Sequence, residues 1–178
     1  MPTSHYTQIP AIIEAAITLN PSSILEIGVG CGKYGALLRE YLTVWGHYFE
    51  PWGSVPLVID GIEIHPLYAD SPAWACYDSV VVADARTAPL NQHYDMALMV
   101  DALEHFEPAE GLGLLDRLLD HADAVLVGVP GGFFPTVEVW DNPHEIHRSG
   151  WTAEDMPDFD VEVLHDCDFR VMVVRRCT

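Results

Sequence analysis

Three side chains that can move protons follow an apolar run near the middle of the sequence. Asp101, Glu104 and His105 lie at the end of the segment YDMALMVDALEHF. If a helical turn begins after residue 101, the three occupy positions i, i+3 and i+4 and share one face. An imidazole titrates near neutral pH and can take the proton of a hydroxyl group. We therefore predict that Asp101, Glu104 and His105 border a reacting centre in which His105 is the general base.

A second polar cluster follows the next apolar run. Residues 131–151 combine a proline and glycine turn with aromatic side chains, and they include Asn142, His144, Glu145 and His147. A loop of this kind, leaving the carboxyl end of a strand, is where an α/β fold places substrate recognition. We expect residues 131–151 to cover a pocket, and His144 and His147 to join the catalytic group.

Three alternating glycines lie much earlier in the chain, in the segment SILEIGVGCGKYG. A dinucleotide-binding turn needs a small residue where this segment has Lys33, so the spacing disfavours a dinucleotide-dependent oxidoreductase. The sequence instead spaces Gly28, Gly30 and Gly32 two residues apart, and bare backbone at such positions lets a ligand approach closely. The acid at Glu26 suits a cationic ligand better than a pyrophosphate.

Two further acids end apolar runs: Glu63 in GIEIHP and Asp84 in VVVADA. Ligands of α/β sheets bind at the carboxyl ends of strands, so we expect both acids beside the glycine turn. A carboxylate fixed there can accept hydrogen bonds from two hydroxyl groups. An aromatic insertion at residues 46–56 lengthens the connection to Glu63, and we expect it to reach over the pocket.

A sheet must position these side chains, because short apolar runs alternate with amphipathic stretches along the chain. The central runs are apolar on both faces, as strands covered by helices on both sides must be. Helical spacing marks residues 32–46 and 108–122, and TAED at 152–155 indicates a capped short helix. The predicted strands are residues 24–29, 57–64, 79–83, 96–100, 124–129, 161–164 and 169–174.

Only residues 165–168 separate the last two predicted strands, which is too short a connection for a parallel crossover. These strands must therefore form an antiparallel hairpin at the edge of the sheet. The predicted fold is α/β: a doubly wound, mostly parallel seven-stranded sheet with an antiparallel C-terminal hairpin and helices on both faces. Because 49% of the 178 residues are hydrophobic, we expect one domain spanning residues 1–178.

Together these motifs resemble those of class I S-adenosylmethionine (SAM) dependent methyltransferases. The glycine turn resembles that family's acid-x-G-x-G-x-G motif, and the hairpin resembles the end of its seven-stranded sheet. The segment from Asp101 to His105 resembles the D/E-x-x-E-H of many of its small-molecule enzymes. The resemblance implies SAM as cofactor, with Glu63 on the ribose and Asp84 with the Ala85 amide on the adenine. The implied cofactor-binding residues are Glu26, Gly28, Gly30, Gly32, Glu63, Ile64, Asp84, Ala85 and Asp101.

The implied function is transfer of a methyl group from SAM to oxygen, and secondarily to nitrogen, of a small-molecule acceptor such as a sugar or phenol. The product of the cofactor would be S-adenosylhomocysteine (SAH). One alternative is a SAM-binding sensor or partner subunit without catalysis. Another resembles RNA-end 2′-O-methyltransferases, in which an E-x-x-E-H segment and a later histidine hold a divalent metal. Metal assistance stays an alternative, and no metal ligand is assigned in the predicted site.

Composition restricts the partners. The chain has eight Lys and Arg residues and 27 Asp and Glu residues, which gives a formal charge of -19. Such a charge repels a phosphate backbone, which argues against nucleic acid as a partner. The four cysteines show no C-x-x-C spacing, and no apolar run is long enough to span a membrane. We therefore expect a cytoplasmic protein without a membrane partner. The hairpin edge favours either a monomer or a homodimer paired across a two-fold axis.

Overall fold

One twisted sheet organises the chain. The computed structural model describes residues 4–45, 47, 49–51, 53–138 and 142–177. The described residues form a seven-stranded sheet in the order β3-β2-β1-β4-β5-β7-β6. The strands are β1 (Ser23–Ile27), β2 (Val58–Glu63), β3 (Ser79–Val82), β4 (Met96–Val100), β5 (Val125–Pro130), β6 (Phe159–Asp166) and β7 (Phe169–Arg176).

The strand directions match the prediction. Strands β3, β2, β1, β4 and β5 pair in parallel, whereas β7 is antiparallel to both β5 and β6. The tight hairpin pairs Asp166 with Arg170, and a bulge between Val163 and His165 shifts the register of β6. The predicted fold class, a mostly parallel sheet with an antiparallel C-terminal hairpin, is confirmed.

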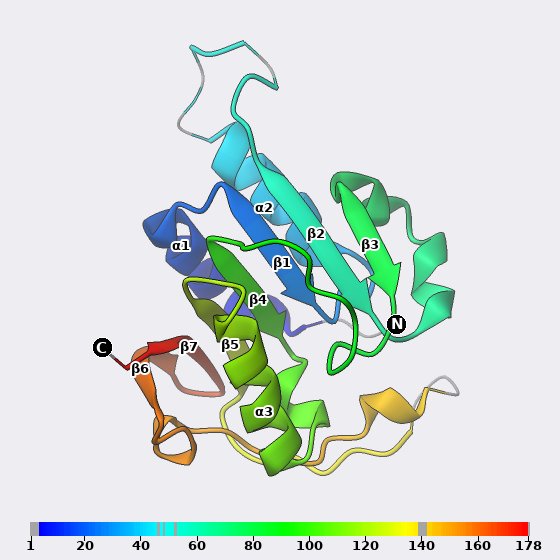
Figure 1. Cartoon of the computed structure of the whole chain (residues 1–178), viewed down its shortest axis with the longest axis vertical. Helices are drawn as coiled ribbons and strands as arrows, with labels where there is room; N and C mark the ends of the chain where they lie inside the picture. Colours follow the sequence, from blue (N-terminus) through cyan, green and yellow to red (C-terminus); the bar gives the residue numbers. More distant parts are fainter. Residues whose placement is uncertain (1–3, 46, 48, 52, 139–141, 178) are drawn as a thin grey trace.

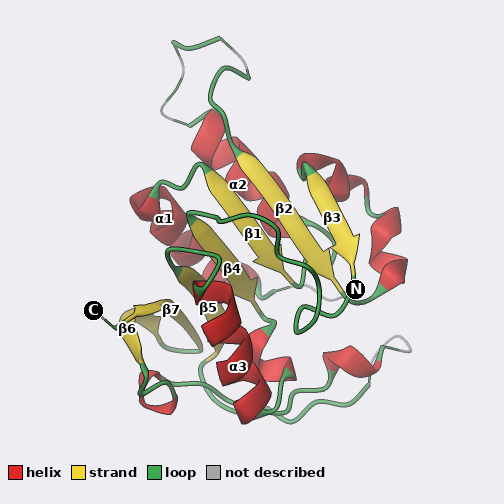
Figure 2. Cartoon of the chain, in the orientation of Figure 1, coloured by secondary structure: helices red, strands yellow, loops and turns green. Residues whose placement is uncertain are grey.

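Helices cover both faces of the sheet (Figure 2). Helices α1 (Ile9–Leu19) and α2 (Lys33–Thr43) pack on one face through buried side chains such as Ile12 and Leu38. Helix α3 (Pro108–Leu119) packs on the other through Leu115 and Leu118. Helix α1 was not predicted, because a run of Ile and Ala is compatible with a buried strand as well as a helix.

The loops that follow the parallel strands gather at one edge of the sheet (Figure 1). Short 3-10 helices lie in them: η2 (Pro66–Asp70) and η3 (Pro72–Cys76) after β2, η4 (Leu103–His105) after β4, and η5 (Pro143–Glu145) and η6 (Ala153–Asp155) after β5. Thr152 and Asp155 form the capping box that TAED indicated. The carboxyl ends of the strands and these loops therefore form the edge at which ligands of such folds bind.

The insertion at residues 46–56 lies elsewhere. It connects α2 to the start of β2, and Figure 1 shows this connection projecting from the opposite edge of the sheet. Among its described residues, Phe49 is fully exposed. The expectation that residues 46–56 reach over the pocket is therefore wrong for the described part, because the insertion precedes a strand and so lies at that strand's amino end. Residues 46, 48 and 52 are outside the described residues.

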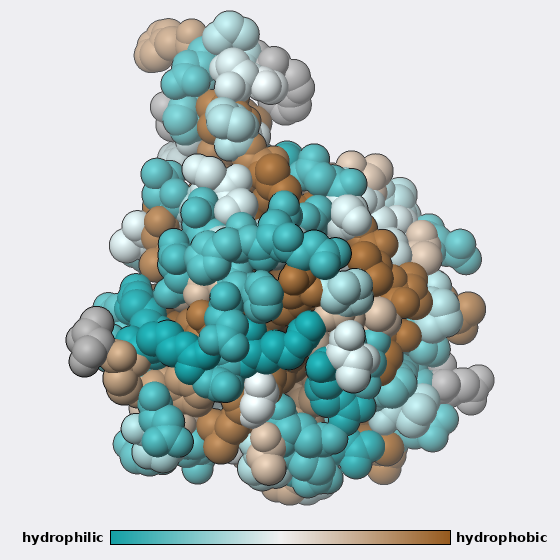
Figure 3. All heavy atoms as spheres, in the orientation of Figure 1, coloured by the Kyte–Doolittle hydropathy of each residue, from teal (hydrophilic) through white to brown (hydrophobic). Residues whose placement is uncertain are grey.

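The surface agrees with the composition. Figure 3 shows mainly hydrophilic side chains on the face that carries α3. No helix in the described ranges has the length and apolarity needed to cross a bilayer.

Candidate functional site

Two adjoining cavities open at the carboxyl edge of the sheet. The first pocket has a volume of about 430 Å³, and Glu63, Asp84 and His144 are among its lining residues. The second pocket has a volume of about 310 Å³, and Glu104 and His147 are among its lining residues. Both pockets are lined by Gly28, Gly30, Asp101, His105 and Glu145. The cavities therefore meet, and a ligand in one can reach a group in the other.

The glycine turn forms the floor where the two pockets meet. Gly28 has φ of 78°, a conformation that suits glycine, and its N–H donates to the Ile62 carbonyl at 2.9 Å. Gly32 caps the start of α2 and lines neither pocket. A Cβ on Gly32 would lie 3.0 Å from the carbonyl carbon of Ala73. Gly28 and Gly30 thus line both pockets, whereas Gly32, which was expected beside them, lets η3 pack against the turn.

Glu63 is tied to the same turn. Its Oε2 accepts from the Gly30 N–H at 2.7 Å and its Oε1 accepts from the His65 N–H at 2.8 Å. Burial raises the pKa of Glu63, and these two backbone hydrogen bonds oppose the rise. Each carboxylate oxygen has a second lone pair, so Glu63 can still accept from hydroxyl groups in the first pocket, which Ile64 also lines.

Asp84 is held in its charged form by Arg86. The Arg86 guanidinium donates to both carboxylate oxygens of Asp84, with Nη2 2.6 Å from Oδ2. These hydrogen bonds lower the pKa of Asp84. Arg86 also pairs with Glu110 and lies 5.9 Å from the centroid of the Phe106 ring. The sequence predicted Asp84 and the following Ala85 at this pocket, but it gave no indication that Arg86 fixes the carboxylate.

Glu26 lines the second pocket as a buried acid. Its Oε2 accepts from the Tyr77 hydroxyl at 2.6 Å. Burial raises the pKa of Glu26 to about 8. Glu26 is therefore mostly protonated at neutral pH in the free protein, and a cation bound beside it would favour the charged form.

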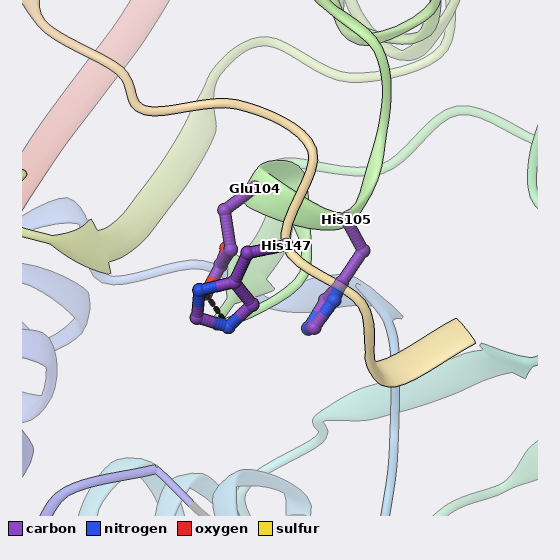
Figure 4. Close-up of side chains that lie close together, drawn as sticks. All are labelled: Glu104, His105 and His147. Carbon is purple, nitrogen blue, oxygen red and sulfur yellow. Dashed lines mark ion pairs between the residues drawn. The ribbon is translucent and has the colours of Figure 1, made fainter. Parts of the chain in front are cut away.

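Glu104, His105 and His147 lie close together in the second pocket (Figure 4). Glu104 and His105 come from η4, and His147 comes from the loop after β5. The His147 Nε2 lies 4.0 Å from Glu104 Oε1, and the His105 and His147 rings meet edge-on with centroids 4.9 Å apart. The predicted association of these three residues is therefore present in the structure.

His105 has the environment of a neutral base. Its Nδ1 lies 3.3 Å from the Ile146 carbonyl oxygen, and in the tautomer that donates this hydrogen bond the Nε2 keeps its lone pair. Burial lowers the pKa of His105, which keeps the imidazole neutral at physiological pH.

Asp101 directly follows β4 and has an uncommon backbone conformation, with φ of 48°. Its Oδ2 accepts from the Gln8 side chain at 2.6 Å, and burial raises its pKa. Positive φ at a non-glycine residue beside a pocket is a feature of functional sites. His144, in contrast, is exposed and lines only the first pocket, so the structure does not bring it into the group around Glu104.

Buried contacts fix the position of η4. The Trp151 ring packs on Gly111 of α3, and its Nε1 donates to the Leu103 carbonyl at 3.2 Å. The backbone N–H groups of Arg148 and Ser149 donate to the Glu104 carbonyl at 2.8 and 3.1 Å. The loop after β5 is therefore attached directly to the turn that carries Glu104 and His105.

Comparison with known proteins relates this geometry to a fold family. No protein-family model and no curated protein matches the chain. Solved structures match over nearly its whole length. The CcbJ methyltransferase of Streptomyces caelestis is 14% identical, with 99% of each chain covered and a TM-score of 0.70. The chain has the class I methyltransferase fold.

Two further methyltransferase-fold structures agree. The methyltransferase domain of a bacterial CtHen1 is 14% identical, with 96% of this chain and 100% of that one covered and a TM-score of 0.65. The N-terminal domain of EvdMO1, crystallised in the presence of SAH and D-fucose, is 16% identical. The match covers 100% of this chain and 86% of that one, with a TM-score of 0.66.

One group within this methyltransferase fold has the composition of a metal site. Ligand atoms of Glu104, His105 and His147 all lie within 4.8 Å of one another. Three buried atoms of this group have no hydrogen-bond partner among the described residues. They are both carboxylate oxygens of Glu104 and the Nδ1 of His147. Imidazole and carboxylate together suit a divalent transition metal, so these residues could hold one.

The sequence did not indicate two further residues of the site, Tyr68 and Ser4. The side chains of Tyr68, on η2, and Asn142, before η5, are hydrogen-bonded to each other and to Glu145. The N-terminal segment lies at the second pocket, where Lys33 Nζ donates to the Ser4 carbonyl at 2.7 Å. No motif marks Tyr68 or Ser4, because their roles arise from loops that meet only in the folded chain.

Proposed function

We propose that this chain is an enzyme that transfers a methyl group from SAM to an oxygen, and secondarily to a nitrogen, of a small-molecule acceptor such as a sugar or phenol. The observation that carries the proposal is the junction of the two pockets. The first pocket offers Glu63 and Asp84 to a nucleoside, and it opens directly onto His105. The methyltransferase fold of the chain and the SAH in the crystals of the EvdMO1 domain support this reading.

The residues fit the cofactor chemically. A cavity of about 430 Å³ lies within the range of small-molecule and cofactor sites. Glu63 retains acceptor capacity for ribose hydroxyls, and Asp84 stays charged for an exocyclic amine. Glu26, in the second pocket, suits the ammonium group of the methionine tail.

The residues of the second pocket supply proton transfer and positioning. SAM supplies an electrophilic methyl group on a sulfonium centre and leaves as SAH. His105 Nε2 accepts the hydroxyl proton of the acceptor as the new oxygen–carbon bond forms. Glu104 and His147 border the same space and orient the acceptor, which is where much of the rate enhancement of a methyl transfer can arise.

Calorimetric titration with SAM and with SAH tests the cofactor proposal. We expect both ligands to bind, and no heat from either at high micromolar concentration would refute the proposal. Turnover is then measured as SAH release with a mixture of hydroxylated metabolites. His105→Ala should lower the rate by about 100-fold or more, whereas His93→Ala, at an exposed residue that lines neither pocket, should not change it. Binding without any turnover would favour the sensor alternative.

A second candidate is methyl transfer assisted by a divalent metal. The observation that favours it is the buried set of unpartnered atoms on Glu104 and His147 beside His105. A metal held there would lower the pKa of an acceptor hydroxyl. Full turnover by protein stripped with a chelator would exclude this variant, and restoration of a lost rate by one divalent ion would support it. A short RNA belongs among the acceptors, although the charge of -19 argues against it.

A further inference from the structure

Glu145 lies where the two pockets meet. Among the described residues, the side chains that line both cavities are those of Asp101, His105 and Glu145, while Gly28 and Gly30 contribute backbone. The inference that follows rests on the proposed function. If the nucleoside of SAM lies in the first pocket and its methyl group faces the second, the sulfonium must lie at this junction.

A ring of hydrogen bonds fixes the Glu145 carboxylate. Its Oε1 accepts from the Tyr68 hydroxyl at 2.9 Å and from the Asn142 Nδ2 at 3.0 Å. Asn142 is 1% exposed, also donates to the Tyr68 oxygen at 3.0 Å, and accepts from the His144 N–H at 3.0 Å. No hydrogen bond between described residues uses the Oε2 of Glu145. One oxygen is thus anchored and the other is left for a ligand.

The charges around this carboxylate favour a cation. Glu63 lies on its first-pocket side and Glu104 on its second-pocket side. Burial is the largest cause that raises the pKa of Glu63 and of Glu104, and the negative charge of Glu145 also raises both. Glu104 is 1% exposed and has no hydrogen-bond partner among the described residues. The lysine and arginine side chains among the described lining residues of the two pockets already have partners. Lys33 Nζ is bonded to the Ser4 carbonyl, Arg86 pairs with Asp84 and Glu110, and Arg148 pairs with Glu107.

We propose that Glu145 is a cofactor-binding residue whose carboxylate recognises the positive charge of the SAM sulfonium. Asn142 and Tyr68 are positioning residues that hold this carboxylate at the junction. Because SAH carries a neutral thioether in place of the sulfonium, the Glu145 carboxylate stabilises the substrate form of the cofactor more than the product form. The consequence is a preference for SAM over SAH that favours product release.

Titration calorimetry with SAM and SAH on the full chain tests the role of Glu145. Glu145→Gln removes the charge, while the side-chain carbonyl can accept the same two hydrogen bonds. We expect the affinity for SAM to fall about tenfold and that for SAH to change less than about twofold. Glu138→Gln removes the same charge from an exposed position on the same loop and should leave the SAM to SAH ratio unchanged.

Two outcomes would overturn the assignment. One is an equal change, or no change, in the affinities for both ligands in Glu145→Gln. The other is that Asp101→Asn loses the preference for SAM over SAH while Glu145→Gln keeps it, which would assign recognition of the positive charge to Asp101. If the unaltered protein binds neither SAM nor SAH, the proposed function itself fails, which is a different result from binding without a Glu145 effect.

The positioning roles have their own readout. Tyr68→Phe and Asn142→Ala should reduce the SAM to SAH affinity ratio in the unaltered background and have no further effect on the ratio in Glu145→Gln. A merely structural role would weaken both ligands alike and leave the ratio constant. Additive reductions of the ratio in the double variants would show that Tyr68 and Asn142 act independently of Glu145, contrary to the proposal.

Discussion

At the scale of single residues, burial and hydrogen bonding decide the charge of the acids at the carboxyl edge. Asp84 meets a guanidinium and its pKa is lowered, whereas burial raises the pKa of Glu26 to about 8. The two occupy equivalent places near strand ends, so the sequence alone treats them alike. A cationic ligand would therefore meet Asp84 already charged, whereas Glu26 would have to lose a proton when the ligand binds.

Glu26 should make the stability of the free protein depend on pH. Its carboxyl ionises near 4.5 in the unfolded chain and near 8 when buried. Because the folded state keeps the proton longer, the free energy of unfolding should fall as the pH rises from 4.5 to about 8. Glu26→Gln should remove the share of that fall that Glu26 contributes, which at about 1.4 kcal/mol per pKa unit is on the order of 2–4 kcal/mol. The share that comes from the other acids whose pKa is raised by burial, Glu63, Asp101 and Glu104, should stay.

Urea unfolding at pH 5.5 and at pH 8, followed by tryptophan fluorescence, measures this effect. Glu14→Gln, at an exposed position of α1, is the control and should retain the pH dependence of the unaltered protein. An unchanged slope in Glu26→Gln would contradict the assignment of the proton to Glu26.

At the scale of elements, the position of η4 depends on the packing of α3. Gly111 leaves room for the Trp151 ring, and Trp151 in turn bonds the Leu103 carbonyl at the start of η4. The placement of Glu104 and His105 therefore depends on a helix that does not itself line the second pocket. A change in that helix can reach the site through two buried contacts.

Two glycines of α3 separate helix propensity from packing. A Cβ on Gly111 would lie 2.5 Å from a Trp151 ring carbon, whereas nothing lies within 4 Å of one on Gly113. Gly111→Ala should destabilise the protein by about 1–3 kcal/mol through overpacking. Gly113→Ala should stabilise it by about 0.5–1 kcal/mol, since alanine loses less backbone entropy.

Chemical denaturation gives both free energies, and SAM binding reports on the site. The prediction requires opposite signs for the two variants, and weaker cofactor binding only in Gly111→Ala. Stabilisation by both substitutions would show that Trp151 can move aside without cost, and that η4 is not positioned through Gly111.

At the scale of the whole molecule, net charge opposes the compact state. The formal charge is -19, and self-repulsion of that size is relieved when salt screens it. Exposed pairs such as that of Arg176 with Asp116 and Asp120 act in the other direction, because salt weakens them. Surface pairs are each worth little, so the repulsion should dominate.

The thermal midpoint should therefore rise as NaCl is increased from about 0.02 M to about 0.3 M, over which the Debye length shortens severalfold. Differential scanning calorimetry at constant pH measures the shift, and KCl at the same ionic strength serves as the control for ion identity. A midpoint that falls with salt would mean that local ion pairs outweigh the net charge.

The sequence by itself determined the fold and the edge of the sheet at which the candidate site lies. Strand period, glycine spacing and the short link at residues 165–168 are local properties, and the carboxyl ends of parallel strands must meet at one edge. For that reason the sequence could place Glu63, Asp84 and the pair Glu104 and His105 at one edge of the sheet, where the structure has them lining the two pockets.

Only the tertiary structure decided how loops distant in sequence meet. Residues 68 and 142 are 74 positions apart, yet their side chains bond and hold Glu145 at the junction of the pockets. His144 and His147 are close in sequence but line different cavities. Periodicity in a strand or helix fixes side-chain direction, but an irregular loop has no period, so its contacts depend on the whole fold.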